Sequence, residues 1–155
     1  MFVPLLTALH VTTVVLWIGG VAFVTIIIFP LLLKMEDSFE KVLLFQRVEN
    51  RFAKQARVYA WTAGITGAML LYLTGQHRAL FTLNGLGVTV MLMVWLVYTL
   101  VLTFEKKIFA LLFSQPEKLD AVKIFARLNA FHWVVLGLSL AAVFIGVWAG
   151  HGGRF

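Results

Sequence analysis

Four long stretches of the chain contain no Lys, Arg, Asp or Glu, and they cover residues 2–33, 58–77, 79–104 and 128–153. A helix needs roughly 20 apolar residues to cross a hydrocarbon layer about 30 Å thick, so each stretch is long enough. A helix also satisfies its own backbone hydrogen bonds, which lipid cannot do. The pattern therefore predicts an all-α fold, an integral membrane four-helix bundle in a single domain over residues 1–155. Its spans are expected at about 4–33, 52–75, 83–107 and 128–149.

The charged residues gather in two connecting segments, 34–57 and 105–127. In the first segment, apolar and charged positions alternate at roughly helical spacing, which predicts an interfacial amphipathic helix or an extension of the second span. In the second segment, Pro116 is expected to mark a turn before a short helix at 117–126. Pro30 lies near the end of the first span and predicts a kink there, because proline lacks a backbone N–H.

Small residues predict which helix faces pack together. Gly64 and Gly67 in the second span and Gly146 in the fourth belong to stripes of Gly and Ala, which allow membrane helices to approach closely. The third span has no such stripe after Gly87 and is rich in Leu, Val, Met and Trp. We expect it to be the helix most exposed to lipid, or the one that contacts a membrane-protein partner or a second copy of the chain.

Composition narrows the class of protein further. A hydrophobic fraction of 61% excludes an ordinary soluble domain. The net charge of +6 does not indicate nucleic-acid binding, because the basic residues flank the predicted spans, where topology and anionic lipid account for them. The chain contains no cysteine, which excludes disulfides, thiolate metal sites and a thiol nucleophile.

The connecting segments also predict the orientation in the membrane. The first and third connections carry eleven basic residues, namely Lys34, Lys41, Arg47, Arg51, Lys54, Arg57, Lys106, Lys107, Lys118, Lys123 and Arg127. Outside them the chain has only Arg78 in the second connection and Arg154 near its C-terminus. Basic connections stay on the cytoplasmic side, so both termini are predicted to face outward, N-out and C-out.

Histidines are the only obvious ligands for a metal or haem in this chain. No charged residue lies in the middle of a predicted span, which argues against a buried carboxylate relay. Counting back roughly 20 residues from Lys34 at 1.5 Å each places His10 near the outer boundary. His77 and His151 end the second and fourth spans on the same side, whereas His132 begins the fourth span on the opposite side.

The pattern therefore predicts a candidate metal site at the outer face made of His10, His77 and His151. With no thiolate available, imidazole would bind copper or the iron of haem b. The alternative for His77 and His151 is a solvated residue at a helix end. The alternative for His10 is a buried histidine bonded to a carbonyl or to a threonine of a neighbouring helix. No catalytic residue is identified.

The segment 9–20, LHVTTVVLWIGG, followed by Pro30, resembles the first helix of the membrane copper-resistance D family. That helix combines Leu-His with a following Trp-x-Gly-Gly and a proline near its inner end. Similar elements recur before and within the second span and before the last one, at Arg51-Phe52, Arg57, Ile65-Thr66-Gly67 and Phe125-x-Arg127-Leu128-Asn129. Related membrane protoporphyrinogen oxidases share the Leu-His…Trp pattern and bind haem b through the histidine of the first helix.

The resemblance implies a multi-pass protein of the bacterial inner membrane that handles copper or transfers electrons to a membrane partner. It implies His10 as the first ligand of haem b or copper. A haem-dependent protoporphyrinogen oxidase is an alternative that the same resemblance implies. A third possibility is a cofactor-free structural subunit of a larger membrane complex, docked through the third span.

The orientation yields a direct prediction. A reporter protein fused after Phe155 should be active only on the outer side of the membrane, because both basic connections hold the opposite side in the cytoplasm. Two parallel fusions would measure this, one to an enzyme that is active only in the periplasm and one to a protein that fluoresces only in the cytoplasm. A cytoplasmic signal would overturn both the orientation and the predicted outer position of His10.

Overall fold

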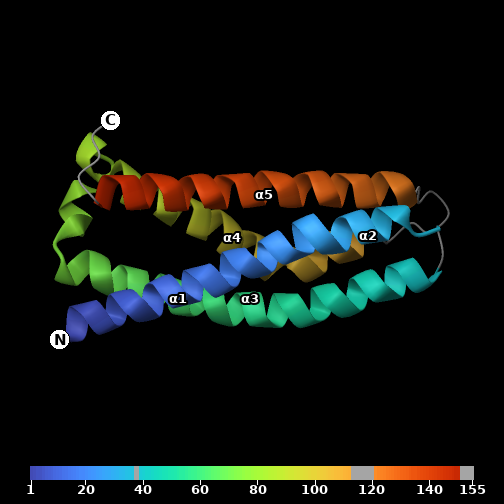
Figure 1. Cartoon of the computed structure of the whole chain (residues 1–155), viewed down its shortest axis with the longest axis horizontal. Coiled ribbons are helices and arrows are strands. Elements are labelled where there is room, and N and C mark those ends of the chain that lie inside the picture. Colours follow the sequence, from blue (N-terminus) through green and yellow to red (C-terminus); the bar gives the residue numbers. More distant parts are fainter. Residues whose placement is uncertain (37–38, 113–120, 151–155) are drawn as a thin grey trace.

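The computed structural model describes residues 1–36, 39–112 and 121–150, and these residues are almost entirely helical (Figure 1). The predicted all-α fold is confirmed for this part of the chain. The elements in order are α1 (Phe2–Phe23), the π-helix η1 (Val24–Ile28), α2 (Phe29–Lys34), α3 (Phe39–Leu73), the short 3₁₀ helices η2 (Gln76–Ala79) and η3 (Leu83–Gly85), α4 (Leu86–Leu112) and α5 (Ala121–Gly150).

Three helical segments are long and apolar enough to cross a membrane: Phe2–Lys34, Leu83–Phe104 and Lys123–Ala149. The prediction of membrane-spanning helices is confirmed for these three. The second predicted span, 52–75, falls in α3, which does not reach the same length of apolar sequence. Its uncharged part within the helix runs only over residues 58–73, because charged residues occupy the first half of α3.

Two predicted boundaries change in the structure. From Phe39 onward the connecting segment is part of α3, which runs through it without a break. The prediction of a separate interfacial helix is therefore wrong, and the alternative, an extension of the second span, is confirmed. The short helix expected at 117–126 is also not separate from residue 121 onward, because α5 runs unbroken from Ala121. Its first residues, 117–120, and Pro116 lie outside the described residues. No Gly or Pro interrupts either segment, so each helix simply continues.

The four long helices lie side by side, and α1 crosses α3, so that α1 and α2 lie between α3 and α5 only in the half toward the α2–α3 connection (Figure 1). The closest pairs are α1 with α3 and α4 with α5, whereas α3 and α4 touch along a shorter length. Figure 1 also shows the start of α1 and the end of α5 at the same end of the molecule, together with η2 and η3. The connection between α2 and α3 lies at the opposite end. The described long helices thus alternate in direction (Figure 1).

Pro30 distorts the first helix where the sequence predicted a kink. The distortion is a π-helical turn, η1, directly before the proline, and the backbone N–H of Phe29 bonds to the carbonyl of Val24 five residues back. Proline cannot donate to the carbonyl four residues earlier, and its ring would collide with that carbonyl in a regular helix. The wider turn relieves this conflict.

The buried side chains form two clusters along the bundle. The first lies midway and contains Trp17, Val21, Ala56, Ala60, Ala63 and Leu136. The second lies toward the α2–α3 connection and contains Val24, Phe29, Leu32, Phe45 and Phe125. Small alanines of α3 face α1 in the first cluster, whereas three phenylalanines meet edge-on or tilted in the second. The structure therefore packs small side chains at its centre and aromatic rings toward the α2–α3 connection.

The three glycines predicted to face neighbouring helices do so. Gly64 lies against the Trp95 ring, Gly67 against the His10 ring, and Gly146 against the Met91 side chain. The indole N–H of Trp95 also donates to the carbonyl of Ala60 over 2.8 Å, which fixes α4 to α3. The prediction that the third span is the most exposed is confirmed among the three apolar segments, since it has the smallest buried share.

The Gly64 contact generates a stability prediction. A methyl group on Gly64 would overlap the Trp95 ring, which its hydrogen bond to Ala60 holds in place. Gly64→Ala should therefore lower the free energy of unfolding by about 1–3 kcal/mol through overpacking. Unfolding in detergent, followed by tryptophan fluorescence, measures this.

Gly137→Ala is the matched control, because a methyl group there meets no atom within 4 Å. Alanine favours helix over glycine by about 1 kcal/mol, so this control should be neutral or stabilised. Equal stability of the two variants would show that Gly64 does not pack against Trp95.

Candidate functional site

His10 points from α1 into the contact with α3. Its Nδ1 lies 2.9 Å from the hydroxyl oxygen of Thr66. The next residue, Gly67, gives the ring its space, since a Cβ there would lie 3.1 Å from the Cε1 of His10. The lack of a side chain at Gly67 and the threonine before it together define where the imidazole sits. The half-buried ring is thus held from one side by α3.

The hydrogen bonds assign the protons of this pair. The Thr66 hydroxyl lies 2.6 Å from the carbonyl of Thr62, one turn back, and a carbonyl can only accept. The hydroxyl proton therefore points to Thr62, and the Thr66 oxygen accepts the proton that His10 carries on Nδ1. The other ring nitrogen of His10, Nε2, keeps its lone pair. This is the state in which histidines bind metals, with the second N–H donated to an acceptor that orients the ring.

His77 lies in η2, beyond the end of α3, and is exposed. Its Nδ1 lies 3.3 Å from the carbonyl of Leu71, and its ring stacks on Tyr72 with centroids 5.7 Å apart. Leu71 belongs to the last turn of α3, whose carbonyls have no partner within the helix. The histidine therefore covers a helix end. Leu71 lies five residues beyond Thr66, or about 7–8 Å further along the helix axis than the level of His10.

His132 occupies the opposite half of the molecule, as predicted. Its Nδ1 lies 2.9 Å from the carbonyl of Leu128 in the same helix. Its ring packs on Phe29, with centroids 4.6 Å apart, beside the aromatic cluster near the α2–α3 connection. His132 therefore shares no site with His10.

Within residues 1–36, 39–112 and 121–150, no group of three His, Cys, Asp or Glu side chains could hold a metal ion. The predicted site includes a histidine beyond these ranges, so it stays a prediction. His151 lies outside the described residues. Of the predicted ligands, His10 of α1 is bonded to Thr66 of α3, and His77 lies in η2, just beyond the end of α3. The alternative for His10, a bond to a threonine of a neighbouring helix, is confirmed.

A group of polar and aromatic side chains deeper in the bundle escaped the sequence analysis. Trp17 is 5% exposed, and its indole N–H has no hydrogen-bond partner among the described residues. Its ring meets the Tyr98 ring edge-on, with centroids 4.5 Å apart. The Tyr98 hydroxyl lies 3.5 Å from the Ser139 hydroxyl. Tyr98 and Ser139 are among the few polar residues in their uncharged stretches, which is the signal that could have drawn attention to them.

Comparison of the chain with protein-family models, curated proteins and solved structures finds no match.

The His10–Thr66 pair yields a prediction that does not depend on a cofactor. Thr66→Val keeps the shape of the side chain but removes the oxygen that accepts the His10 proton. The carbonyl of Ala63 remains as a partner of His10, so the variant loses one hydrogen bond and the free energy of unfolding should fall by about 0.5–1.5 kcal/mol. Thr74→Val is the matched control, because Thr74 is exposed in the turn directly after α3 and its hydroxyl donates to the carbonyl of Leu70. An equal effect in both variants would show that the contact with His10 contributes nothing.

Proposed function

We propose that the chain crosses the membrane four times, with the apolar half of α3 as the remaining crossing and both termini outside. The length of that half, 58–73, is marginal for a crossing. However, its buried residues Ala60, Ala63 and Thr66 pack within the bundle, mainly on α1, and so only part of its surface faces lipid. The polar side chains of its first half lie beyond the hydrocarbon layer, toward the basic side of the molecule.

Within this topology we propose that the protein holds a metal centre, haem b or copper, near the outer ends of its helices. His10 is the first ligand. The observation that supports this is the orientation of the ring, in which the bond of Nδ1 to Thr66 makes Nε2 the nitrogen that would bind a metal. The role follows the resemblance to the copper-resistance D family: copper handling or electron transfer in a bacterial inner membrane.

The second ligand would be His77 or His151. The chemistry of His77 fits, because its Nδ1 lies at a carbonyl and its Nε2 is therefore the accepting nitrogen. Its position fits less well, since its ring stacks on Tyr72 nearer the helix end. For His77 to serve, its ring would have to leave Tyr72 and turn toward α1. A bound haem or copper would supply one-electron chemistry. The chain's own contribution is that Thr66 orients His10 and apolar side chains exclude water.

One observation favours a second candidate function, a cofactor-free subunit of a larger membrane complex. The segment Leu83–Phe104, which contains most of α4, has the smallest buried share of the three apolar segments. In that case His10 would join α1 to α3, and the exposed face of α4 would contact the partner. The measurement that separates the two functions is the metal and haem content of the purified protein.

The site assignment predicts distinct effects of the four histidine variants. His10→Ala should abolish retention of haem or copper, because it removes the ligand with the fixed orientation. Either His77→Ala or His151→Ala should weaken retention strongly, and that variant identifies the second ligand. Haem absorbance and metal content per protein after purification measure this.

His132→Ala is the matched control, because that histidine lies in the other half of the bundle against Phe29. Its cofactor content should equal that of the wild type. Full occupancy in His10→Ala, or loss caused by His132→Ala alone, would refute the assignment.

A further inference from the structure

A shallow groove lies between α3 and α4, where these two helices separate. It is small, with a cavity volume of about 50 Å³, and it opens to the surface, so a ligand would lie over it and only partly within it. Its lining residues are Arg57, Ala60 and Trp61 of α3 and Thr99, Leu102 and Thr103 of α4. The Trp95 ring closes the seam beyond Ala60, to whose carbonyl it is bonded. The Trp95 ring therefore closes one end of the groove, and the charged side chain of Arg57 lies at the other end.

The groove lies at the level where the sequences of both α3 and α4 change from uncharged to charged. In α3, Arg57 is the last charged residue before the uncharged half, and Trp61 follows one turn later with 59% of its surface exposed. In α4, the uncharged stretch ends at Phe104, directly after Thr103, and Glu105, Lys106 and Lys107 follow. Tryptophan concentrates at the boundary between lipid tails and headgroups. The groove thus lies at the level of lipid phosphates in one leaflet.

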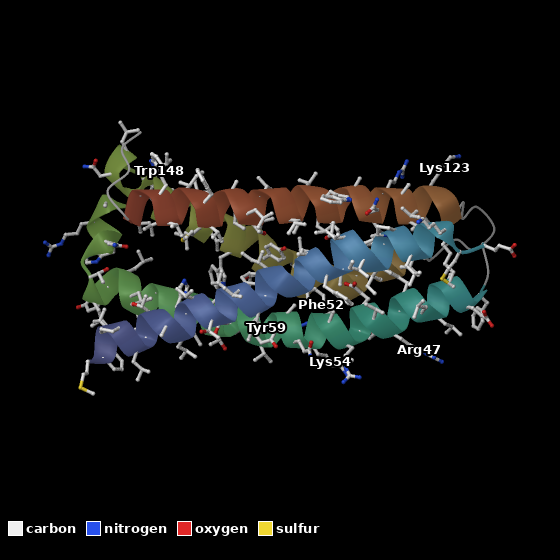
Figure 2. The ribbon with its side chains drawn as sticks, in the orientation of Figure 1. Arg47, Phe52, Lys54, Tyr59, Lys123 and Trp148 are labelled. Carbon is white, nitrogen blue, oxygen red and sulfur yellow. The ribbon has the colours of Figure 1, made fainter. Side chains whose placement is uncertain are left out.

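The charged side chain that lines the groove favours an anion. Arg57 is that side chain, and the charged residues that follow the groove on α4, Glu105, Lys106 and Lys107, add a net charge of +1. Lys54 and Arg47 lie on the same half of α3 but project away from the other helices, so they do not line the groove (Figure 2). A guanidinium offers five donors in a planar fork that matches phosphate, so Arg57 can serve a phosphate alongside other contacts. Basic grooves between membrane helices bind acidic headgroups.

The two threonines add a second chemical requirement. The Thr99 hydroxyl lies 2.9 Å from the carbonyl of Trp95, and the Thr103 hydroxyl lies 2.6 Å from the carbonyl of Thr99. Carbonyls only accept, so both hydroxyl protons are committed to the helix. The threonine oxygens can then only accept a hydrogen bond from a ligand. A ligand that suits the whole groove carries a phosphate at one end and hydroxyl donors at the other.

We propose that this groove binds the headgroup of one acidic phospholipid of the phosphoglycerol type. Its phosphate contacts Arg57, and its glycerol hydroxyls donate to Thr99 and Thr103. Its acyl chains leave over the exposed Trp61 ring, since Trp95 blocks the seam below. The proposal requires that α3 enters the membrane as proposed above, but it is independent of the metal centre.

Native mass spectrometry of the full chain in detergent tests the proposal. Phosphatidylglycerol, phosphatidic acid and phosphatidylcholine are added at equal concentrations. Of the three lipids, phosphatidylglycerol should bind most tightly. Its affinity should be about tenfold higher than that of phosphatidylcholine, because one charge-assisted hydrogen bond contributes about that factor. Arg57→Gln should reduce its binding to the level of phosphatidylcholine, and Arg57→Lys should retain part of it. Arg78→Gln, a basic residue at the other end of the bundle, is the matched control and should change nothing.

The threonines are tested by the double variant Thr99→Val, Thr103→Val. It should bind phosphatidylglycerol and phosphatidic acid equally while still preferring both to phosphatidylcholine. Soluble glycerol 3-phosphate is added in a separate arm, and displacement of the lipid by it at equal concentration would assign the site to a soluble ligand instead. Two results would overturn the proposal. One is equal binding of phosphatidylglycerol and phosphatidylcholine to the wild type. The other is an unchanged preference for phosphatidylglycerol in an Arg57→Gln variant whose free energy of unfolding equals that of the wild type. Metal content recorded on the same samples reports separately on the metal centre.

Discussion

The need to satisfy polar groups within each helix shapes this molecule. Long uncharged stretches must pair their backbone groups internally, and their hydroxyls do the same. The hydroxyls of Thr13, Thr25, Thr99 and Ser139 each bond to a carbonyl four residues back in their own helix. Few polar groups remain to join one helix to another. Association of the helices therefore depends on close approach at small residues and on a small number of bonds between helices.

Three polar contacts between long helices stand out. His10 bonds to Thr66 and joins α1 to α3, the indole of Trp95 bonds to a carbonyl of α3, and the Tyr98 and Ser139 hydroxyls meet between α4 and α5. Two of them occur beside a glycine of α3, Gly67 or Gly64, where a side chain would block the approach. The same residues that bring the backbones together thus also position the polar groups. The orientation of His10, the candidate metal ligand, and the close packing of α1 on α3 therefore both depend on Gly67.

Much of the fold follows from charge and size patterns that act along one helix. The absence of charge identified the apolar helices, the glycine stripes identified faces that contact neighbours, and Pro30 located the distortion in the first helix. The continuity of α3 was harder to predict, because alternation of charged and apolar positions fits a surface helix and an extension equally well. The start of α5 was missed because Pro116 suggested a break that residues 121–126 do not contain.

The candidate site was less predictable, for a physical reason. Spacing within one helix indicates that His10 lies on an apolar stripe, but it does not fix the rotation and shift of α3 that bring Thr66 to it. The same limit hid the meeting of Trp17, Tyr98 and Ser139, which come from three different helices. Depth alone grouped His10 with His77, whereas the structure gives His77 a carbonyl at the helix end and an aromatic neighbour.

The absorption spectrum of the wild-type protein, recorded together with its metal content directly after purification, tests the central claim most directly. A metal centre at His10 predicts either a Soret band with about one haem per chain or stoichiometric copper without that band. Protein that is folded, carries neither haem nor copper and takes up neither on addition would contradict the metal centre and leave His10 as a contact between helices.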